Sequence, residues 1–361
     1  MPQAVVRDVL RAISSNVQAT QSTSAKQARS ESNLVINPLN SNHLVGASKK
    51  FIEPEQYRFT LAAIVSLDGG ASWKEAQPFT LLPDWDGISD PALAWDEEGN
   101  IYLVALPFPP PTDPRDTLGI AVYKSGDGGL TWGNPKMIHS STGDDKQWAT
   151  SDLNASSPYY GRVYAAWDDG SVLRFARTSD HGQTWRGVGQ TPINQTSLAT
   201  DSFAPEISVA PNGHVFIVYW NRSTTGTKQL KFLKSTDGGG TFSAPQVVAT
   251  PIIDLESVFP KTGGWSQFPG STFRVLTVAT GCAGANGEIL VAWADAREQY
   301  EGKPVSRIYY RRSPDGGRRG TDLPLGNRYF RQRSTPQFPT VSPTISIRRS
   351  SVRLSRAVQT S

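Results

Sequence analysis

Short runs of β-branched and aromatic residues, each bounded by Gly, Asn, Asp or Pro, recur along most of this chain. Such runs are typical of strands. Residues 91–105 indicate a strand, a tight turn and a second strand, and 205–220 repeat the pattern. Residues 274–278 with 288–293 repeat it again, 152–167 form a longer-turned version, and 33–48 resemble an opening copy. Helical periodicity is nearly absent apart from a short amphipathic piece at 5–13, so the pattern predicts an all-β chain.

A second motif, Ser-x-Asp-x-Gly-x-Thr-Trp, lies between these strand pairs. It occurs at 66–73, 125–132, 178–185 and 235–242, and a fifth copy at 313–317 ends at Arg318. Asp-Gly between apolar runs favours a hairpin turn, and the Asp, Ser and Thr side chains can hydrogen-bond to the turn backbone. We therefore expect a structural role in the turn, rather than ligand binding, for the five motif aspartates: Asp68, Asp127, Asp180, Asp237 and Asp315.

Each repeating unit supplies four predicted strands. Two come from the strand pair, one enters the Asp motif and one leaves it, as at 135–138 and 245–249. A repeat of about 50 residues built from short strands is typical of a β-propeller. Five units are recognisable in the sequence.

These four intact motifs resemble the Asp-box, or bacterial neuraminidase repeat, of the sialidase-like superfamily, and the resemblance covers residues 33–317. It implies a six-bladed β-propeller of four-stranded antiparallel blades. The sixth and incomplete blade would come from residues beyond 317 or from pairing of the two termini. Asp boxes also occur in propellers that are not sialidases, including sortilin-type receptors and photosystem assembly factors. The motif therefore supports a fold more strongly than an activity.

Composition divides the chain into a leader (1–32), a propeller (33–317) and a basic tail (318–361). The leader is rich in Ser, Gln and Ala, which is typical of a flexible segment. The tail has nine Arg and one acidic residue, Asp322, so it carries +8 while the rest carries −4 of the formal +4. It is either a natural disordered tail or a sequence that leaves its ancestral reading frame after Gly317. The acidic body argues against a nucleic-acid partner.

The composition also limits the disulfides, metal sites and membrane segments that can be expected. The single cysteine, Cys282, excludes an intrachain disulfide and falls in a predicted turn at 280–284. The four His show no metal-ligand spacing, so no cofactor is expected. Clustered aspartates suit Ca²⁺, but no loop has a calcium-ligand spacing. No stretch approaches the ~20 apolar residues of a membrane span. The given sequence contains no signal peptide, although Asp-box proteins are often secreted, and it indicates neither compartment nor oligomeric state.

The chemistry of a propeller is expected where loops and the starts of innermost strands meet at the central funnel. Several polar and aromatic residues recur at these positions. Carboxylates can act as acid, base or hydroxyl acceptor, Arg binds a substrate carboxylate, and Trp stacks on a sugar face. The predicted catalytic set includes Asp90, Asp145, Asp201 and Glu206, and the predicted substrate-binding set is Arg274, Arg297 and Trp148.

The resemblance to sialidases implies a Tyr nucleophile activated by a Glu, an Asp acid/base and three Arg that bind the sialic acid carboxylate. Chain order makes Tyr310, or its neighbour Tyr309, the candidate nucleophile. The Phe/Tyr-Arg-Ile-Pro motif that carries the first Arg is absent, and residues 56–59 (Gln-Tyr-Arg-Phe) are its nearest imitation. Three functions stay open: a sialidase-like glycoside hydrolase acting on glycans, a non-catalytic propeller that binds a glycan or protein, and a scaffold.

Overall fold

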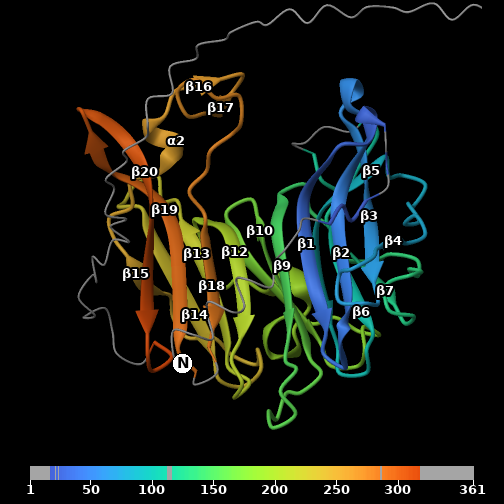
Figure 1. The fold of residues 1–361 in the computed structure, drawn as a ribbon. Helices are drawn as coiled ribbons and strands as arrows, with labels where there is room; N and C mark the ends of the chain where they lie inside the picture. The colour runs from blue at the N-terminus through green and yellow to red at the C-terminus, as the bar shows by residue number, and fades with distance from the viewer. Residues whose placement is uncertain (1–16, 21, 23, 112–115, 285–286, 318–361) are drawn as a thin grey trace, which may run out of the picture. The chain divides into compact units, whose positions relative to one another are not determined.

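The computed structural model describes residues 17–20, 22, 24–111, 116–284 and 287–317. This part of the chain consists of antiparallel sheets with very little helix (Figure 1). The predicted helical piece at 5–13 and the basic tail at 318–361 lie outside the described residues.

Five sheets of three or four strands follow one another in chain order. The first is β1 (Arg29–Asn37), β2 (Asn40–Glu53), β3 (Arg58–Ser66) and β4 (Lys74–Glu75), and the second is β5 (Gly87–Trp95), β6 (Ile101–Phe108), β7 (Ile120–Ser125) and β8 (Lys136–His139). The third is β9 (Asp144–Ser151), β10 (Val163–Asp169) and β11 (Val172–Thr178). The fourth is β12 (Ser202–Val209), β13 (Val215–Asn221), β14 (Gln229–Ser235) and β15 (Gln246–Ala249), and the fifth is β18 (Ala279–Ala283), β19 (Ile289–Tyr300) and β20 (Lys303–Ser313).

Short elements lie between and before these sheets. A small insertion between the fourth and fifth sheets contains helix α2 (Leu255–Val258) and the hairpin of β16 (Lys261–Thr262) and β17 (Trp265–Ser266). The 3₁₀ helices are η1 (Ala25–Gln27), η2 (Pro54–Gln56), η3 (Val188–Gln190) and η4 (Ile193–Gln195).

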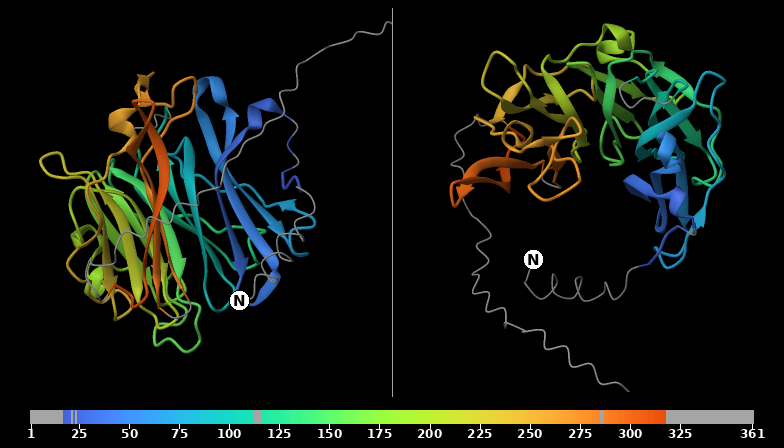
Figure 2. Two further views of the ribbon diagram at one scale, coloured as in Figure 1. Left: turned by 60° about the vertical axis from the view of Figure 1, so that its left-hand side comes forward. Right: turned by 90° about the horizontal axis from the view of Figure 1, so that it is seen from above.

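The first strand of each sheet lies beside the first strand of the next. β1 contacts β5, β5 contacts β9, β9 contacts β12, and β12 contacts β18. The sheets therefore stand one after another around a common axis lined by their first strands (Figure 2). Trp95, at the end of β5, pairs with Ile101, which pairs with Ser125 of the second Asp box. The Asp boxes thus lie where the first strands end, and we call the opposite end, where those strands begin, the axial face.

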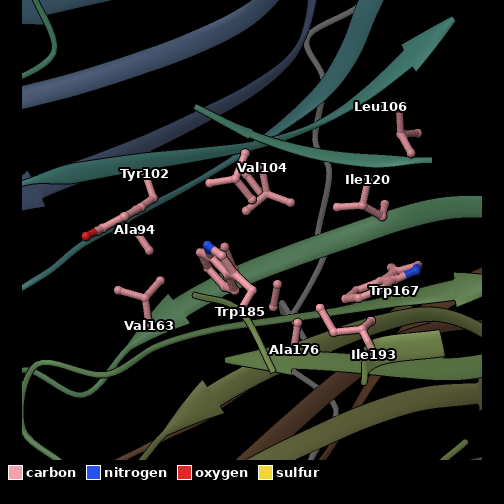
Figure 3. Close-up of a cluster of buried hydrophobic side chains, with 14 of the residues drawn as sticks. Ala94, Tyr102, Val104, Leu106, Ile120, Val163, Trp167, Ala176, Trp185 and Ile193 are labelled. Atoms are coloured by element: carbon pink, nitrogen blue, oxygen red, sulfur yellow. The ribbon is translucent and has the colours of Figure 1, made fainter. Parts of the chain in front are cut away.

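Aromatic and aliphatic side chains fill the space between successive sheets. Between the second and third sheets, Trp185 of the third Asp box packs edge-on against Tyr102, with ring centroids 6.2 Å apart (Figure 3). Trp167, in the same cluster, is completely buried. Each such aromatic removes roughly 150–250 Å² of surface from water, so these clusters hold neighbouring sheets together and fix the axial face.

The Asp boxes are closed by hydrogen bonds to the aspartate. Asp68 accepts the hydroxyl of Ser66 at 2.8 Å, and the backbone N–H and the hydroxyl of Ser72 at 2.8 and 2.6 Å. Trp73 donates its indole N–H to the carbonyl of Gly70 at 3.0 Å. The same bonds to the aspartate recur at Asp127, Asp180 and Asp237. In these boxes the carboxylate is occupied by its own turn, as the turn chemistry requires.

Each later Asp box is also bonded to the preceding sheet. In every case a basic side chain contacts the carbonyl of the residue after the box aspartate. The contacts are His43 Nε2 to Gly128 (2.8 Å), Lys124 to His181 (2.8 Å), Arg162 to Gly238 (2.9 Å) and Lys234 to Gly316 (3.2 Å). The repeat therefore couples neighbouring sheets as well as closing its own turn.

Two sheets depart from the predicted four strands. The third sheet has three strands, and two isolated bridges to β11, Arg177 with Arg186 and Leu173 with Ala199, take the place of its fourth. Between the two bridges the chain forms η3 and η4, which interrupt the fourth strand before the chain returns to the sheet edge at Ala199. The described part of the fifth sheet also has three strands.

The strand predicted at 274–278 is wrong. Arg274 pairs with Gln267, and the N–H of Val275 donates to the carbonyl of Ser266 at 2.8 Å, so this segment joins the insertion instead of β19. The strand that pairs with β19 is β18, five residues later. Cys282 consequently lies in this strand and not in a turn.

The first sheet also begins earlier than the predicted boundary at residue 33. β1 starts at Arg29, which pairs with Lys50, and Ser30 pairs with Lys49. Because these residues are polar, the hydrophobic pattern of the sequence does not predict a strand here. Glu31 and Ser32 are thereby placed within the first sheet.

Candidate functional site

Four of the first strands bulge where they begin. The register of the ladder shifts between Ser30 and Asn33 in β1 and between Ser89 and Ala92 in β5. It also shifts between Phe203 and Glu206 in β12, and the pairing of β9 with β10 shifts between Ala166 and Asp168 of β10. Each bulge holds a non-glycine residue at positive φ: Glu31 (54°), Asp90 (53°), Lys146 (55°) and Ala204 (49°). Such backbone costs of order 1–3 kcal/mol per residue and concentrates at functional sites. The bulges therefore mark the axial face as a candidate site.

The bulges bring two carboxyl groups and two ammonium groups together. The Ser89 hydroxyl lies 3.0 Å from Glu31 Oε2 and 2.7 Å from Asp90 Oδ1. Lys49 Nζ lies 3.7 Å from Glu31 Oε2, and Lys146 Nζ lies 3.5 Å from Asp90 Oδ2. We call these five residues the axial cluster.

The axial cluster perturbs the two carboxyl groups in opposite directions. Partial burial, followed by the charge of Asp90, raises the pKa of Glu31 to about 7. Burial opposes ionisation of Asp90 too, but the charge of Lys146 and hydrogen bonds from Glu31 and Ser89 hold the pKa of Asp90 below its usual range. Glu31 is thus the proton-bearing member of the pair near neutral pH.

Lys49 is fixed beneath the cluster. Its side chain is only 6% exposed, and Nζ lies 4.0 Å above the centre of the Phe59 ring and 3.5 Å from the Tyr57 hydroxyl. A cation over aromatic faces is stabilised by the ring quadrupoles. Lys49 therefore places an ammonium group 3.7 Å from Glu31 Oε2.

A pocket of about 270 Å³ opens above the axial cluster. Its carboxyl groups come from Glu31, Asp90 and Glu206, its ammonium group from Lys146, and its largest aromatic surface from Trp148, which is 37% exposed. The remaining lining is mostly small or apolar, from Ser32, Asn33, Pro91, Gln147, Ala204, Pro205, Val278 and Ala279. We call this the axial pocket. An apolar cavity with a few convergent polar groups is the usual form of a small-ligand site.

A second cavity of about 310 Å³ is lined by Asp144, Asp145, Asp168 and Arg222 among others, and its Asp145 lies 3.7 Å from Lys146 of the axial pocket. Burial raises the pKa of Asp168 to about 7, although hydrogen bonds from Ser202 and the N–H of Ala204 oppose this shift. Burial also raises the pKa of Asp144. This cavity therefore places a second carboxyl group that titrates near neutral pH beside the axial pocket.

Two arginines stand near these cavities on aromatic supports. The Arg222 guanidinium lies 3.6 Å above the Phe203 ring, and that of Arg274 lies 4.0 Å above Trp265 and 3.8 Å from Glu256. Planar guanidinium groups held in this way are suited to binding carboxylate or phosphate.

The structure brings some of the predicted site residues together. Asp90, Trp148 and Glu206 line the axial pocket, and Asp145 lies beside it, 3.7 Å from Lys146. Glu206 accepts the Thr280 hydroxyl at 3.0 Å, and burial raises its pKa. Arg274 is an electrostatic neighbour of Lys146.

Three predicted residues lie elsewhere. Asp201 lines a separate cavity of about 890 Å³ beside the insertion. Arg297 is bonded to Asp295 and lies 4.7 Å from the Tyr309 ring centre, within the fifth sheet. Tyr310, on β20, is not among the residues lining the axial pocket. Its neighbour Tyr309 donates its hydroxyl to Glu298 at 2.9 Å.

Sequence reasoning missed several residues of the site. Glu31 falls in the predicted leader, and Lys49, Lys146, Asp168 and Arg222 are not among the predicted site residues. A sequence signal existed for Asp168 and Arg222, because each comes just after the buried tryptophan of a second strand. Asp168 directly follows Trp167, and Arg222 lies two positions after Trp220. No local signal marks Lys49, because its aromatic partners come from three positions on two strands.

Two groups of described residues have spacings compatible with a metal ion. They are His139, Asp144 and Asp169, and Asp96, Glu97 and His181, each with ligand atoms within 4.8 Å. In the first group the carboxylates already accept bonds from His139, Trp167, Ser141 and Arg174. In the second, Asp96 accepts bonds from Asn100 and Tyr102. Protein donors thus already occupy the carboxylates of Asp144, Asp169 and Asp96.

Comparison with solved structures identifies the architecture. The chain is 16% identical to the Hadza microbial sialidase Hz136, with a TM-score of 0.51 over 81% of this chain and 57% of that one. It is 12% identical to a mutant NanB sialidase from Streptococcus pneumoniae, with a TM-score of 0.50 over 81% of this chain and 60% of that one. The chain has a sialidase-like β-propeller fold.

The similarity is limited to the fold. At this identity the match carries no activity, and the chain spans less than two thirds of the length of these two sialidases. No family model matches the sequence. No curated protein matches it either. None of the helices in the described part of the chain has the length and apolar character needed to span a bilayer.

Proposed function

We propose that this protein is a sialidase-like carbohydrate-active protein that binds a glycan in the axial pocket. The observation that supports this function is the alignment of the bulges, which direct Glu31, Asp90 and Lys146 toward one point on the axis. Trp148 provides an exposed aromatic surface on which a sugar ring can stack, and the carboxyl and ammonium groups can bind sugar hydroxyls.

Hydrolysis of a glycosidic bond is a second candidate function. It is favoured by the opposite pKa shifts of Glu31 and Asp90, because environments that separate two carboxyl pKa values are typical of acid–base pairs. A nucleophile is not assigned. No tyrosine is among the residues that line the axial pocket, so Tyr310 is not proposed for this role.

We also propose that a sixth sheet closes the ring between the first and fifth sheets. Leu34 and Ile36, on one side of β1, are 55% and 57% exposed, and Ile308 and Tyr310, on one side of β20, are 74% and 45% exposed. Apolar faces of this kind are usually covered. If a sheet formed outside the described residues covers them, Ile36→Asp and Ile308→Asp will each lower the Tm of the full chain. Unchanged Tm values would exclude it.

The function is tested by a glycan-binding screen followed by calorimetric titration of any glycan that binds. Trp148→Ala is expected to weaken binding at least tenfold, because the variant removes the aromatic surface on which a ligand ring stacks, a contact that contributes about 1–3 kcal/mol for nucleic-acid bases. Tyr160→Ala is the matched control, since Tyr160 is 41% exposed in the turn between β9 and β10, at the opposite end of the same sheet. Equal loss in both variants, or no glycan bound by folded protein, would refute the proposal.

Hydrolysis is tested separately by release of a fluorescent aglycone from an α-sialoside and from neutral glycosides. Turnover that is lost in Asp90→Asn and Asp145→Asn would establish a glycosidase. Glycan binding without turnover would exclude hydrolysis and support the binding function only.

A further inference from the structure

The position of the Ser89 hydroxyl determines how many protons the two carboxyl groups of the axial cluster carry. It lies within hydrogen-bonding distance of Glu31 Oε2 and of Asp90 Oδ1, at 3.0 and 2.7 Å. A hydroxyl has one proton to donate, and an ionised carboxylate can only accept. If both carboxyl groups were ionised, one of the two contacts would place lone pairs against lone pairs. A proton on one carboxyl group satisfies both contacts.

The surrounding charges are consistent with a single proton. The groups that face the pair are Lys49 from β2, at 3.7 Å from Glu31, and Lys146 from β9, at 3.5 Å from Asp90. The charge of Asp145 favours the ammonium form of Lys146, whereas the positive charge of Arg274 opposes it. Two ammonium groups favour ionisation, whereas two adjacent carboxylates oppose a second negative charge. Lys146 is closest to Asp90, which leaves the proton on Glu31.

Glu31 is also the member of the pair that reaches a ligand. Its side chain is 44% exposed and lines the axial pocket, whereas that of Asp90 is 20% exposed. A protonated carboxyl group donates one strong hydrogen bond. The partner that requires a donor is an oxygen with no hydrogen of its own, such as the ring or glycosidic oxygen of a sugar.

We propose that Glu31 and Asp90 share one proton. In the free protein Glu31 donates it to Ser89, whose hydroxyl donates to Asp90. When a glycan binds in the axial pocket, Glu31 donates the same proton to an ether oxygen of the glycan and gives up its hydrogen bond to Ser89. The identity of the ligand rests on the proposed function, whereas the shared proton rests only on the contacts of Ser89. Glycan binding is then linked to protonation, and deprotonation of the pair replaces the donor with a repelling carboxylate. The apparent dissociation constant is expected to rise about tenfold for each pH unit above the midpoint.

The first experiment observes the proton without a ligand. Carboxyl ¹³C NMR of the full chain is recorded from pH 4 to pH 9. Two carboxyl groups, Glu31 and Asp168, are expected to titrate near pH 7. The Glu31 titration is expected to disappear in Glu31→Gln and to move to lower pH in Asp90→Asn, whereas the Asp168 titration remains. The Glu31 titration is expected to move to higher pH in Lys49→Met, which removes a positive charge. Glu55→Gln, in the exposed turn of the same sheet, is the control and leaves it in place. Absence of any Glu31 titration above pH 6 would overturn the shared proton.

The second experiment measures calorimetric glycan affinity between pH 5 and pH 9. Wild type is expected to lose affinity above the NMR midpoint, whereas Glu31→Gln, whose amide donates at every pH, is expected to keep constant affinity. Affinity of wild type that does not change with pH would overturn the donation to the ligand. A folded protein that shows the Glu31 titration but binds no glycan would overturn the proposed function and the ligand assignment, while the shared proton would stand.

Discussion

Replacement of Asp168 by Asn is expected to stabilise the protein at pH 8. The Asp168 side chain is almost completely buried, and burial raises its pKa to about 7 from an ordinary value of 3.8. Its Oδ1 accepts the Ser202 hydroxyl at 2.6 Å and its Oδ2 accepts the N–H of Ala204. An asparagine fits these partners, because its oxygen accepts the Ala204 N–H and its amide donates to the Ser202 oxygen.

The magnitude follows from proton linkage. Between about pH 4 and pH 7 the native protein keeps a proton on Asp168 that the unfolded chain has lost, so the free energy of unfolding falls as the pH rises through this window. Each pKa unit corresponds to about 1.4 kcal/mol, so the cost above pH 7 is about 4 kcal/mol. Asp168→Asn removes the cost, and we expect a gain of about 2 to 4 kcal/mol at pH 8 and little change at pH 4.

The assay is urea unfolding followed by circular dichroism at pH 4, 5, 6, 7 and 8. Asp169→Asn is the matched control with the opposite sign. Against the effect of burial, hydrogen bonds from Ser141 and Arg174 lower the pKa of Asp169, so its ionised form stabilises the native state above the unfolded pKa and this contribution is lost in acid. Asp169→Asn should therefore destabilise at pH 8. Equal loss of stability in Asp168→Asn at pH 4 and pH 8 would refute the reasoning.

Two further predictions concern the framework. Trp167→Phe should cost about 2 kcal/mol more in urea unfolding than Trp220→Phe, because the Trp167 N–H donates to a buried carboxylate at 2.9 Å, whereas the buried Trp220 N–H has no partner in the described part of the chain. Equal costs would exclude this bond as the cause. Gly128→Ala should cost about 3 kcal/mol and lower the calorimetric Tm, because φ is +79° and a Cβ would lie 2.3 Å from the His43 ring. Gly263→Ala, with φ +60° and open space, is its control, and an equal fall in Tm would contradict the steric argument.

The fold was predictable because its chemistry is local. The Asp-box bonds join residues two to four positions apart, as between Ser66, Asp68 and Ser72. A repeat of such turns predicts antiparallel sheets without knowledge of distant contacts. The prediction failed where the neighbouring insertion competed for a strand. Val275 donates to the carbonyl of Ser266, and the first strand of the fifth sheet is therefore β18.

The site was predictable only in part. Asp90, Trp148 and Glu206 precede or begin predicted strands, so their convergence on the axis followed from the propeller pattern. Glu31 and Lys49 could not be found in this way, because the start of β1 has no apolar alternation and is held by pairing with β2. Their meeting with Asp90 depends on contacts across 41 to 59 positions of sequence, which local patterns do not encode.

The two ends of the first strands follow different rules. At the Asp-box end, positive φ falls on the two residues after the box aspartate, which are glycines apart from His181, and the carboxylates accept hydrogen bonds from their own turns. At the axial face, positive φ falls on Glu31, Asp90 and Lys146, and Asp168 is buried with a raised pKa. Local rules are obeyed where the chain needs only stability and broken where acidic and basic groups converge. Such a distribution is expected when the axial face is retained for binding or catalysis rather than for stability.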